Sequence, residues 1–485
     1  MAITEPTVPS SRPITAQIAL QAEDHALVSV PAADRRSGWN LSIGIVGVVT
    51  ALVIFAIAGF TVILAGFWLG LLAGVLVGIL GFGLSALLGR MSWATGVSST
   101  ITSRFFGFGL KGSSLGAIVF AFMILGFLAL ESALLYEGTI LMLGLEDTLA
   151  TKLVIYGLLT IAWITLALFG LKLALRASTV LTVLTIAVAI FVVVQIAAGG
   201  ADLGAVFTQE GIVPGTWWDK VQAAIAVGGA TAGTIALVTS DFARFAKTRK
   251  DVVILAAAGP VVQNVLMTVL GALVVVGGLP AVVDYLMARD TGLTPEAAAA
   301  AAGGFAMGNT GAFFVVIAGW LGFVTIYAAQ AKAQAVNAYS GSLALVNLVN
   351  ALTGRKPSRA LMVVVGNVIA LVMIAGGILG LFSAWLAYLG CMTLALVGVM
   401  IADFYFVRRG AYDKRRIENW NWAGVISLVV SAGVGIWMIA GGVWALGFLV
   451  SLAVALVLYP VLRRLLPEGT GTGFASSAAA LDEAA

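Results

Sequence analysis

Cysteine and histidine are almost absent from this chain of 485 residues, which contains one of each, Cys391 and His25. A lone cysteine cannot form a disulfide within one chain, and it cannot build a cysteine metal site. Zinc sites of the usual kind need several His and Cys ligands. We therefore expect no bound metal and no cofactor.

Charge is also scarce, because charged residues make up 10% of the chain and hydrophobic residues 61%, with a mean hydropathy of +1.08. Ordinary soluble domains have about a quarter of their residues charged. A membrane-spanning helix needs about 20 mostly apolar residues. The sequence therefore predicts an all-α membrane protein with twelve transmembrane helices, at about 41–64, 67–88, 114–143, 152–171, 176–198, 217–240, 251–277, 311–338, 360–381, 383–406, 422–441 and 443–465.

The basic residues indicate the topology. With both termini in the cytoplasm, 22 of the 26 Lys and Arg residues fall on the cytoplasmic side, as multi-pass proteins require. Three fall outside and Lys332 lies within the membrane. We therefore expect a multi-pass protein of the cell's inner (plasma) membrane, and the net charge of +4 does not indicate nucleic-acid binding.

The chain divides into one membrane body and two tails. Residues 1–38 and 466–485 are predicted to be disordered cytoplasmic tails, 39–406 a transmembrane core, and 421–465 two additional spans. No stretch resembles a soluble module. The partners that we expect are the lipid bilayer and a small molecule, without an obligate protein partner.

Glu131 lies in the middle of the third apolar stretch. Ionisable groups at membrane depth are costly and usually mark a substrate or ion pathway. Phe127 is four residues earlier and therefore on the same helix face, while Gln330, Gln334 and Asn337 form a polar stripe along the eighth stretch. Since neither stripe can face lipid, we expect them to enclose a pocket for a flat, nitrogen-rich ligand.

Structural explanations of the same residues stay open. The amides of the eighth stretch could simply bridge helices, Glu131 could be a protonated structural carboxyl, and Phe127 could be a packing residue. Lys332 points about 160° away from Gln334 around the helix. It could pair with a carboxylate, take the place of a bound cation, or extend to the membrane surface.

Glycines are concentrated at 227–233, in the middle of the sixth stretch. Each glycine inside a helix costs about 1 kcal/mol. The cluster is therefore consistent with a helix interrupted at 228–231, and broken helices in transporters expose backbone groups to a ligand at the membrane midplane. Close packing of small residues is the other interpretation.

Three segments resemble the nucleobase:cation symporter family 1, which includes cytosine, purine, allantoin and hydantoin permeases. Thr239 to Phe245 is similar to its Asp-aromatic-x-Arg-aromatic segment, and Val336 to Leu343 to its Asn-x-Tyr-Ser-x-x-Leu stretch. Ala402 to Tyr405, followed by Arg408, looks like the family's ending of the tenth span. The resemblance covers nearly all of residues 36–410.

The resemblance implies the LeuT-type fold, with two inverted five-helix repeats at about 41–198 and 217–406 and two further helices. It places a substrate site between spans one, three, six and eight, with the first span unwound near 49–53. The substrate-binding residues that it implies are Phe127, Glu131, Gly228, Gly229, Gln334, Asn337 and Thr50.

The side chains just before Lys332 on the eighth stretch indicate which ion drives transport. Sodium-coupled relatives carry hydroxyl side chains where this chain has Ala328 and Ala329, although a shift in register would bring Thr325 into that place. We therefore favour protons over sodium as the coupling ion, with Glu131 and Lys332 as coupling residues.

The sequence thus predicts a secondary transporter that imports a purine, cytosine or a related heterocycle by proton symport with alternating access. A sodium-coupled carrier of allantoin, a hydantoin or a vitamin-like solute is the alternative. An enzyme is not expected, because the sequence shows no nucleophile–base pair and no metal constellation.

Overall fold

The computed structural model describes residues 29–290, 292–411 and 417–469. Within these ranges the chain is helical almost throughout, and its one β pairing is an isolated parallel bridge between Arg36 and Ala246. Residues 1–28 and 470–485, which make up most of the two predicted tails, lie outside the described residues.

The first five spans begin with a broken one. Helices α2 (Gly38–Val48) and α3 (Leu52–Ala65) form a pair bent by 70°. The next four spans are formed by α4 (Phe67–Thr95), α6 (Gly109–Leu143), α7 (Leu149–Thr165) with the π-helical turn η2 (Leu166–Gly170), and α8 (Leu171–Ala198).

The sixth and seventh spans are built from shorter pieces. The sixth consists of α10 (Trp217–Gly228) and α11 (Ala230–Ala243). The seventh alternates α-helical and π-helical segments, which are α12 (Arg249–Val261), η3 (Val262–Leu266), α13 (Met267–Gly271), η4 (Ala272–Val276) and α14 (Gly277–Arg289). Pi-helical turns inside α-helices occur frequently at functional sites.

The remaining spans and the short helices complete the chain. The spans are α16 (Gly311–Thr353), which is kinked at Gly319 by a non-helical φ of 54° and ψ of −130°, α17 (Arg359–Ala375), α18 (Phe382–Ile401) with η5 (Ala402–Val407), α19 (Trp422–Ala440) and α20 (Gly447–Leu465). The short helices are η1 (Ala32–Asp34), α5 (Ser99–Phe105), α9 (Leu203–Thr208) and α15 (Pro295–Gly308).

The predicted fold class is confirmed. In the described residues, ten helical segments are long and apolar enough to cross a membrane, and the bent pair α2–α3 makes an eleventh. Helix α17 is a shorter apolar helix of 17 residues at the place of the predicted ninth span. Each predicted stretch therefore falls on a helix.

Several helix ends differ from the predicted stretches. The seventh span is helical to Arg289 instead of 277, and α16 continues to Thr353 instead of 338, whereas α17 already ends at Ala375. Hydropathy does not mark where a helix ends: the added turns of α16 are largely buried, and the helix stops at a left-handed C-cap, Gly354, with a φ of 71°.

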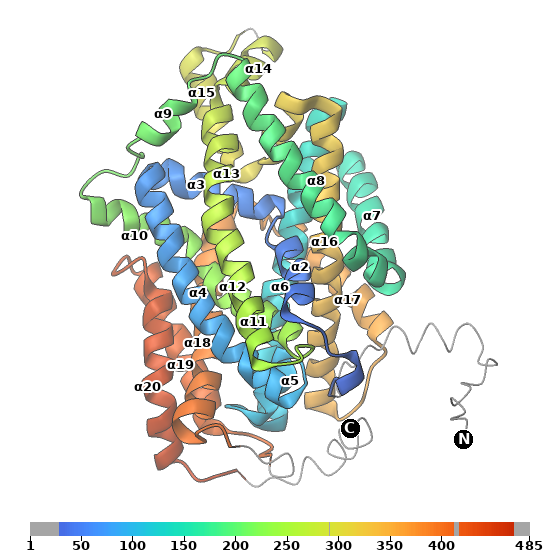
Figure 1. Cartoon of the computed structure of the whole chain (residues 1–485), viewed down its shortest axis with the longest axis vertical. Coiled ribbons are helices and arrows are strands. Elements are labelled where there is room, and N and C mark those ends of the chain that lie inside the picture. The colour runs from blue at the N-terminus through green and yellow to red at the C-terminus, as the bar shows by residue number, and fades with distance from the viewer. Residues whose placement is uncertain (1–28, 291, 412–416, 470–485) are drawn as a thin grey trace, which may run out of the picture.

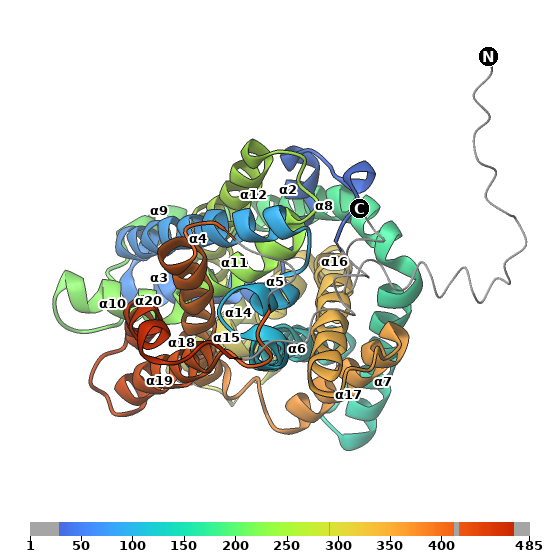
Figure 2. The ribbon, with the colours of Figure 1, turned by 90° about the horizontal axis from the view of Figure 1, so that it is seen from below.

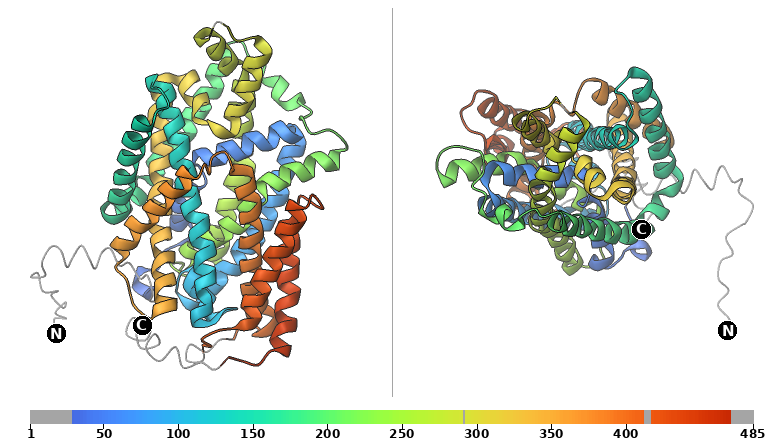
Figure 3. Two further views of the ribbon diagram at one scale, coloured as in Figure 1. Left: turned by 180° about the vertical axis from the view of Figure 1, so that it is seen from behind. Right: turned by 90° about the horizontal axis from the view of Figure 1, so that it is seen from above.

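The long helices lie roughly side by side along the long axis of the molecule, while α3 runs across them (Figure 1). Helix α2 begins and α20 ends at the same end of the bundle, as an even number of crossings requires. Figure 2 shows α6 inside the bundle with α16 beside it, and α19 and α20 at the periphery. From behind, α6 runs through the middle of the molecule (Figure 3).

Candidate functional site

The break in the first span leaves backbone groups without helical partners in the interior. Helix α2 ends at Val48 and α3 begins at Leu52, within the predicted segment 49–53. The hydroxyl of the fully buried Thr50 donates to the Val46 carbonyl at 2.9 Å. The first N–H groups and last C=O groups of any helix lack intrahelical partners, so this break offers both donors and acceptors to neighbouring side chains.

Helix α16 supplies side chains to the break. The Leu52 N–H donates to Oε1 of Gln330 at 3.3 Å, and Nε2 of the same amide donates to the Glu131 carbonyl of α6 at 3.4 Å. Gln330 therefore bridges the broken span and α6. This is the structural role that the sequence left open for the amides.

Lys332 also reaches the break. Its Nζ lies 3.3 Å from the Thr50 carbonyl oxygen and is hydrogen-bonded to the Thr50 hydroxyl. The side chain is buried and interacts electrostatically with Glu131. An ammonium group at the broken end of a helix occupies the kind of position that a bound cation would take.

Glu131, Gln334 and Asn337 are brought together on the facing sides of α6 and α16. The Asn337 Nδ2 donates to Glu131 Oε2 at 3.2 Å and to Gln334 Oε1 at 3.0 Å. All three residues are buried, and Glu131 is only 3% exposed. The acidic group thus meets one carboxamide, Asn337, in a direct hydrogen bond, and the other, Gln334, through Asn337.

Phe127 lies one turn before Glu131 and contacts a tryptophan of the tenth span. Its ring is edge-on to that of Trp385, with 5.0 Å between the centroids and 86° between the planes. Gly126 makes room for the indole, because a Cβ there would lie 2.2 Å from Trp385 Cζ2. The buried Trp385 Nε1 has no hydrogen-bond partner among the described residues, and buried tryptophan N–H groups usually have one.

Comparison with known proteins identifies the chain. Residues 29–459 match the family described as "Permease for cytosine/purines, uracil, thiamine, allantoin". The chain belongs to this permease family. It is therefore a membrane transporter and not an enzyme.

Individual relatives agree with the family. The cytosine permease of Escherichia coli K12 is 26% identical over 429 residues, which cover 84% of this chain and 91% of the relative. The inward-facing structure of Mhp1 has a TM-score of 0.68 at 17% identity, covering 94% of this chain and 97% of Mhp1. Mhp1 in a closed conformation with bromovinylhydantoin bound gives 0.66 at 18% identity, covering 92% and 96%. At these identities, the structures show a shared fold.

The acidic residues of two family-like segments hold the short helix α5 of the permease at its ends. Asp241 Oδ1 accepts the Ser99 N–H at 2.7 Å, at the start of α5. Asp403 Oδ2 accepts the Gly107 N–H at 2.7 Å, just after α5, and pairs with Arg408 at 2.9 Å. These segments therefore build the end of the bundle where α2 begins, away from the Glu131 cluster.

The glycine cluster of the sixth span produces a smaller interruption than expected. Only Gly229 separates α10 from α11, and its φ of −63° and ψ of −30° are helical. A Cβ on Gly229 would lie 2.1 Å from Phe448 Cζ, so close packing explains this glycine. The neighbouring Gly228 faces open space and lines a cavity.

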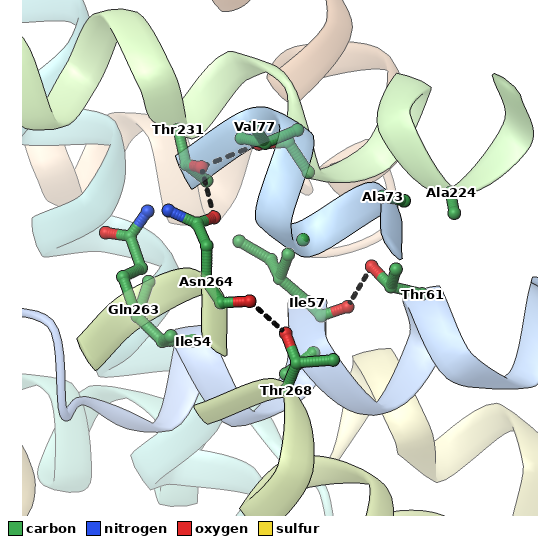
Figure 4. A pocket seen from close by; sticks show the side chains of 13 residues that line it. Ile54, Ile57, Thr61, Ala73, Val77, Ala224, Thr231, Gln263, Asn264 and Thr268 are labelled. Atoms are coloured by element: carbon green, nitrogen blue, oxygen red, sulfur yellow. Dashed lines mark hydrogen bonds between the residues drawn. The ribbon is translucent and has the colours of Figure 1, made fainter. Parts of the chain in front are cut away.

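This cavity lies between α3, α4, the sixth span and the seventh span (Figure 4). About 20 Å³ of it is open to the centre of a water molecule, which is space for about one water. Figure 4 shows Thr231 and Asn264 pointing toward one another, with 3.5 Å between Oγ1 and Oδ1. No sequence pattern predicts this cavity, because its walls come from four segments distant in sequence.

Ser132, Trp163 and Trp385 were also not among the predicted site residues. The one signal for Ser132 in the sequence was that it directly follows Glu131. The two tryptophans gave no such signal, because a tryptophan in an apolar span is interpreted as a packing residue. In the described residues, no group of three or more His, Cys, Asp or Glu side chains is placed to hold a metal.

Proposed function

We propose that this permease imports a nucleobase or a related nitrogen heterocycle, a purine or cytosine first of all, by proton symport with alternating access. The observation that carries the proposal is the buried carboxylate of Glu131, held by Asn337 at 3.2 Å beside Gln334. A carboxylate accepts ring N–H groups, carboxamides both donate and accept, and Phe127 on the same face supplies an aromatic surface. The family description, which includes cytosine and purines, agrees with this ligand class.

Protons are the proposed coupling ion because the break in the first span already holds a cation. Lys332 Nζ bonds the Thr50 oxygens there, and a fixed positive charge disfavours a sodium ion beside it. The neighbouring Ala328 and Ala329 add no side-chain oxygens. Glu131 is then the group that takes up the coupled proton, and Lys332 is its charged partner.

The proposed location is the cell's inner (plasma) membrane with both termini in the cytoplasm. The excess of Lys and Arg in the loops on that side supports this orientation. Membership in a permease family supports a membrane location.

Uptake into proteoliposomes tests the proposal. We expect the wild type to accumulate labelled hypoxanthine or cytosine when the outside is acidic, in sodium-free buffer. Glu131→Gln should abolish this accumulation but keep exchange of labelled for unlabelled substrate, because an amide cannot carry a proton across the membrane.

The matched control is Glu137→Gln, the same change on the same helix, which should leave accumulation intact. Proton-driven accumulation by Glu131→Gln would eliminate the proposed coupling role. A strict requirement for sodium at fixed pH would instead establish the sodium-coupled alternative.

A further inference from the structure

A chain of five buried side chains links α7 to Glu131. Trp163 Nε1 of α7 donates to Ser132 Oγ at 3.2 Å, and Gln334 Nε2 donates to the same oxygen at 2.9 Å. Gln334 continues through Asn337 to Glu131 at 3.0 and 3.2 Å. The inference drawn from this chain rests on the proposed function of the site.

Two groups, one that can only accept and one that can only donate, set the direction of every hydrogen bond in this series of side chains. The Leu128 carbonyl can only accept, and the indole N–H of Trp163 can only donate. Ser132 gives its one hydrogen to the Leu128 carbonyl at 2.8 Å. Its oxygen is therefore left to accept from Trp163 and from Gln334.

This fixes the orientation of the Gln334 amide. Its Nε2 lies 2.9 Å from both the Leu128 carbonyl oxygen and Ser132 Oγ, so both amide hydrogens are used. Gln334 Oε1 must then face Asn337, which has to donate to it. The second hydrogen of Asn337 Nδ2 goes to Glu131 Oε2.

All four hydrogens of the two carboxamides are thus used within the protein. What remains for a ligand is a set of acceptors, namely Asn337 Oδ1, a lone pair of Gln334 Oε1 and the free oxygen of Glu131. A nucleobase edge presents a ring acceptor next to an N–H donor. An unprotonated network can satisfy the N–H but leaves the ring acceptor without a partner.

We infer that the proton on Glu131 is the one hydrogen-bond donor that this amide network can offer to its ligand. Ser132 and Trp163 act as positioning residues, because they keep the Gln334 amide from presenting its own hydrogens. A neutral heterocycle with an acceptor beside an N–H therefore binds together with one proton. The proton enters on the free oxygen of Glu131, donates to the ring acceptor, and leaves when the ligand leaves.

Three other donors near Glu131 lie outside this amide network, namely Trp385 Nε1, which has no partner among the described residues, the Lys332 ammonium, and Gln330 Nε2, which donates to the Glu131 carbonyl at 3.4 Å. Trp385 Nε1 packs against Gly126, five residues before Glu131, which corresponds to about 140° around the helix and about 7.5 Å along it. Lys332 of α16, the charged group that acts on Glu131 from the packed helices, is bonded to Thr50. The remaining neighbours of the carboxyl group from α16 are uncharged amides.

Calorimetry on the purified, full-length protein tests the inference with two flat probes. Hypoxanthine offers an acceptor beside an N–H, whereas protonated 2-aminobenzimidazole offers donors only. In buffers of different ionisation enthalpy, we expect about one proton to be taken up per hypoxanthine bound to the wild type, and none for the 2-aminobenzimidazolium ion.

Glu131→Gln gives the sharpest outcome. The oxygen of the new amide must face the Asn337 hydrogens, so its NH₂ takes the place of the proton. We expect hypoxanthine to bind within a few-fold of wild type without proton uptake, and the 2-aminobenzimidazolium ion to bind about 100-fold more weakly, since it loses a charged acceptor.

The positioning role has its own readout. Ser132→Ala frees a Gln334 hydrogen and should lower the number of protons taken up with hypoxanthine, while Ser132→Thr, which keeps the hydroxyl, should restore it. A general loss of stability would not change this proton count.

Hypoxanthine binding to the wild type without proton uptake, or proton uptake persisting in Glu131→Gln, would overturn the inference and leave nucleobase transport standing. If the wild type bound neither hypoxanthine nor cytosine, the proposed function would fail, and the inference with it.

Discussion

Replacing Lys332 with methionine is expected to destabilise the permease by about 1–3 kcal/mol and to abolish transport. Lys332 is buried, bonds the Thr50 carbonyl at the break in the first span, and interacts electrostatically with Glu131. Without the ammonium group, the buried carbonyl and hydroxyl oxygens of Thr50 lose their donor, and leaving buried polar groups unsatisfied costs about 1–3 kcal/mol. Thermal unfolding in detergent and uptake into proteoliposomes measure the two losses.

Two further variants separate the charge from the loss of a side chain. Lys332→Met combined with Glu131→Gln removes both charges and should recover only the part of the stability that comes from their interaction, and neither the bonds to Thr50 nor proton-driven transport. Lys220→Met, the same change at a half-buried lysine near the start of α10, removes one hydrogen bond, to the Glu210 carbonyl, and should alter stability by no more than about 1 kcal/mol. If Lys332→Met were as stable and active as Lys220→Met, the assigned role of this lysine would be wrong.

Gly424→Ala is expected to cause a comparable structural loss at the start of α19. A Cβ on Gly424 would lie 1.6 Å from the Gly107 carbonyl oxygen, well inside any contact distance. Gly107 cannot easily yield, because its N–H is held by Asp403 at 2.7 Å. We expect a destabilisation of about 3 kcal/mol or more and several-fold less folded protein, measured by size-exclusion chromatography after heating.

Gly433→Ala on the same helix is the matched control. No atom lies within 4 Å of its added Cβ, so the substitution should be neutral or should stabilise α19 by up to about 1 kcal/mol. Equal stability of the two variants would show that α19 does not pack against Gly107 as described.

The intramembrane residues show how far the sequence could lead. Glu131, Gln334 and Asn337 stood out because polar groups within apolar spans need partners, and helical spacing placed them on common faces. The same helical spacing placed Lys332 on a different helix face from Gln334, and in the structure Lys332 bonds Thr50. The positions of these residues in the substrate site stay a prediction.

The glycines of the sixth span show where composition misleads. Glycine density suggested an unwound segment, but Gly229 keeps helical dihedral angles and makes room for Phe448. Packing and unwinding both select glycine, so sequence cannot separate them. The sharp break lies in the first span, around Thr50, where the family resemblance placed it although no glycine stands at 49–53.

The sequence by itself determined the membrane class, the number of apolar stretches and the polar faces within them, because hydropathy and helical periodicity depend only on neighbours along the chain. The tertiary structure alone decided that Trp163 and Ser132 orient Gln334, that Trp385 meets Phe127, and that Lys332 reaches Thr50. Those contacts join residues from separate helices, and their donor directions follow from which backbone carbonyl each side chain meets, which a linear pattern does not contain.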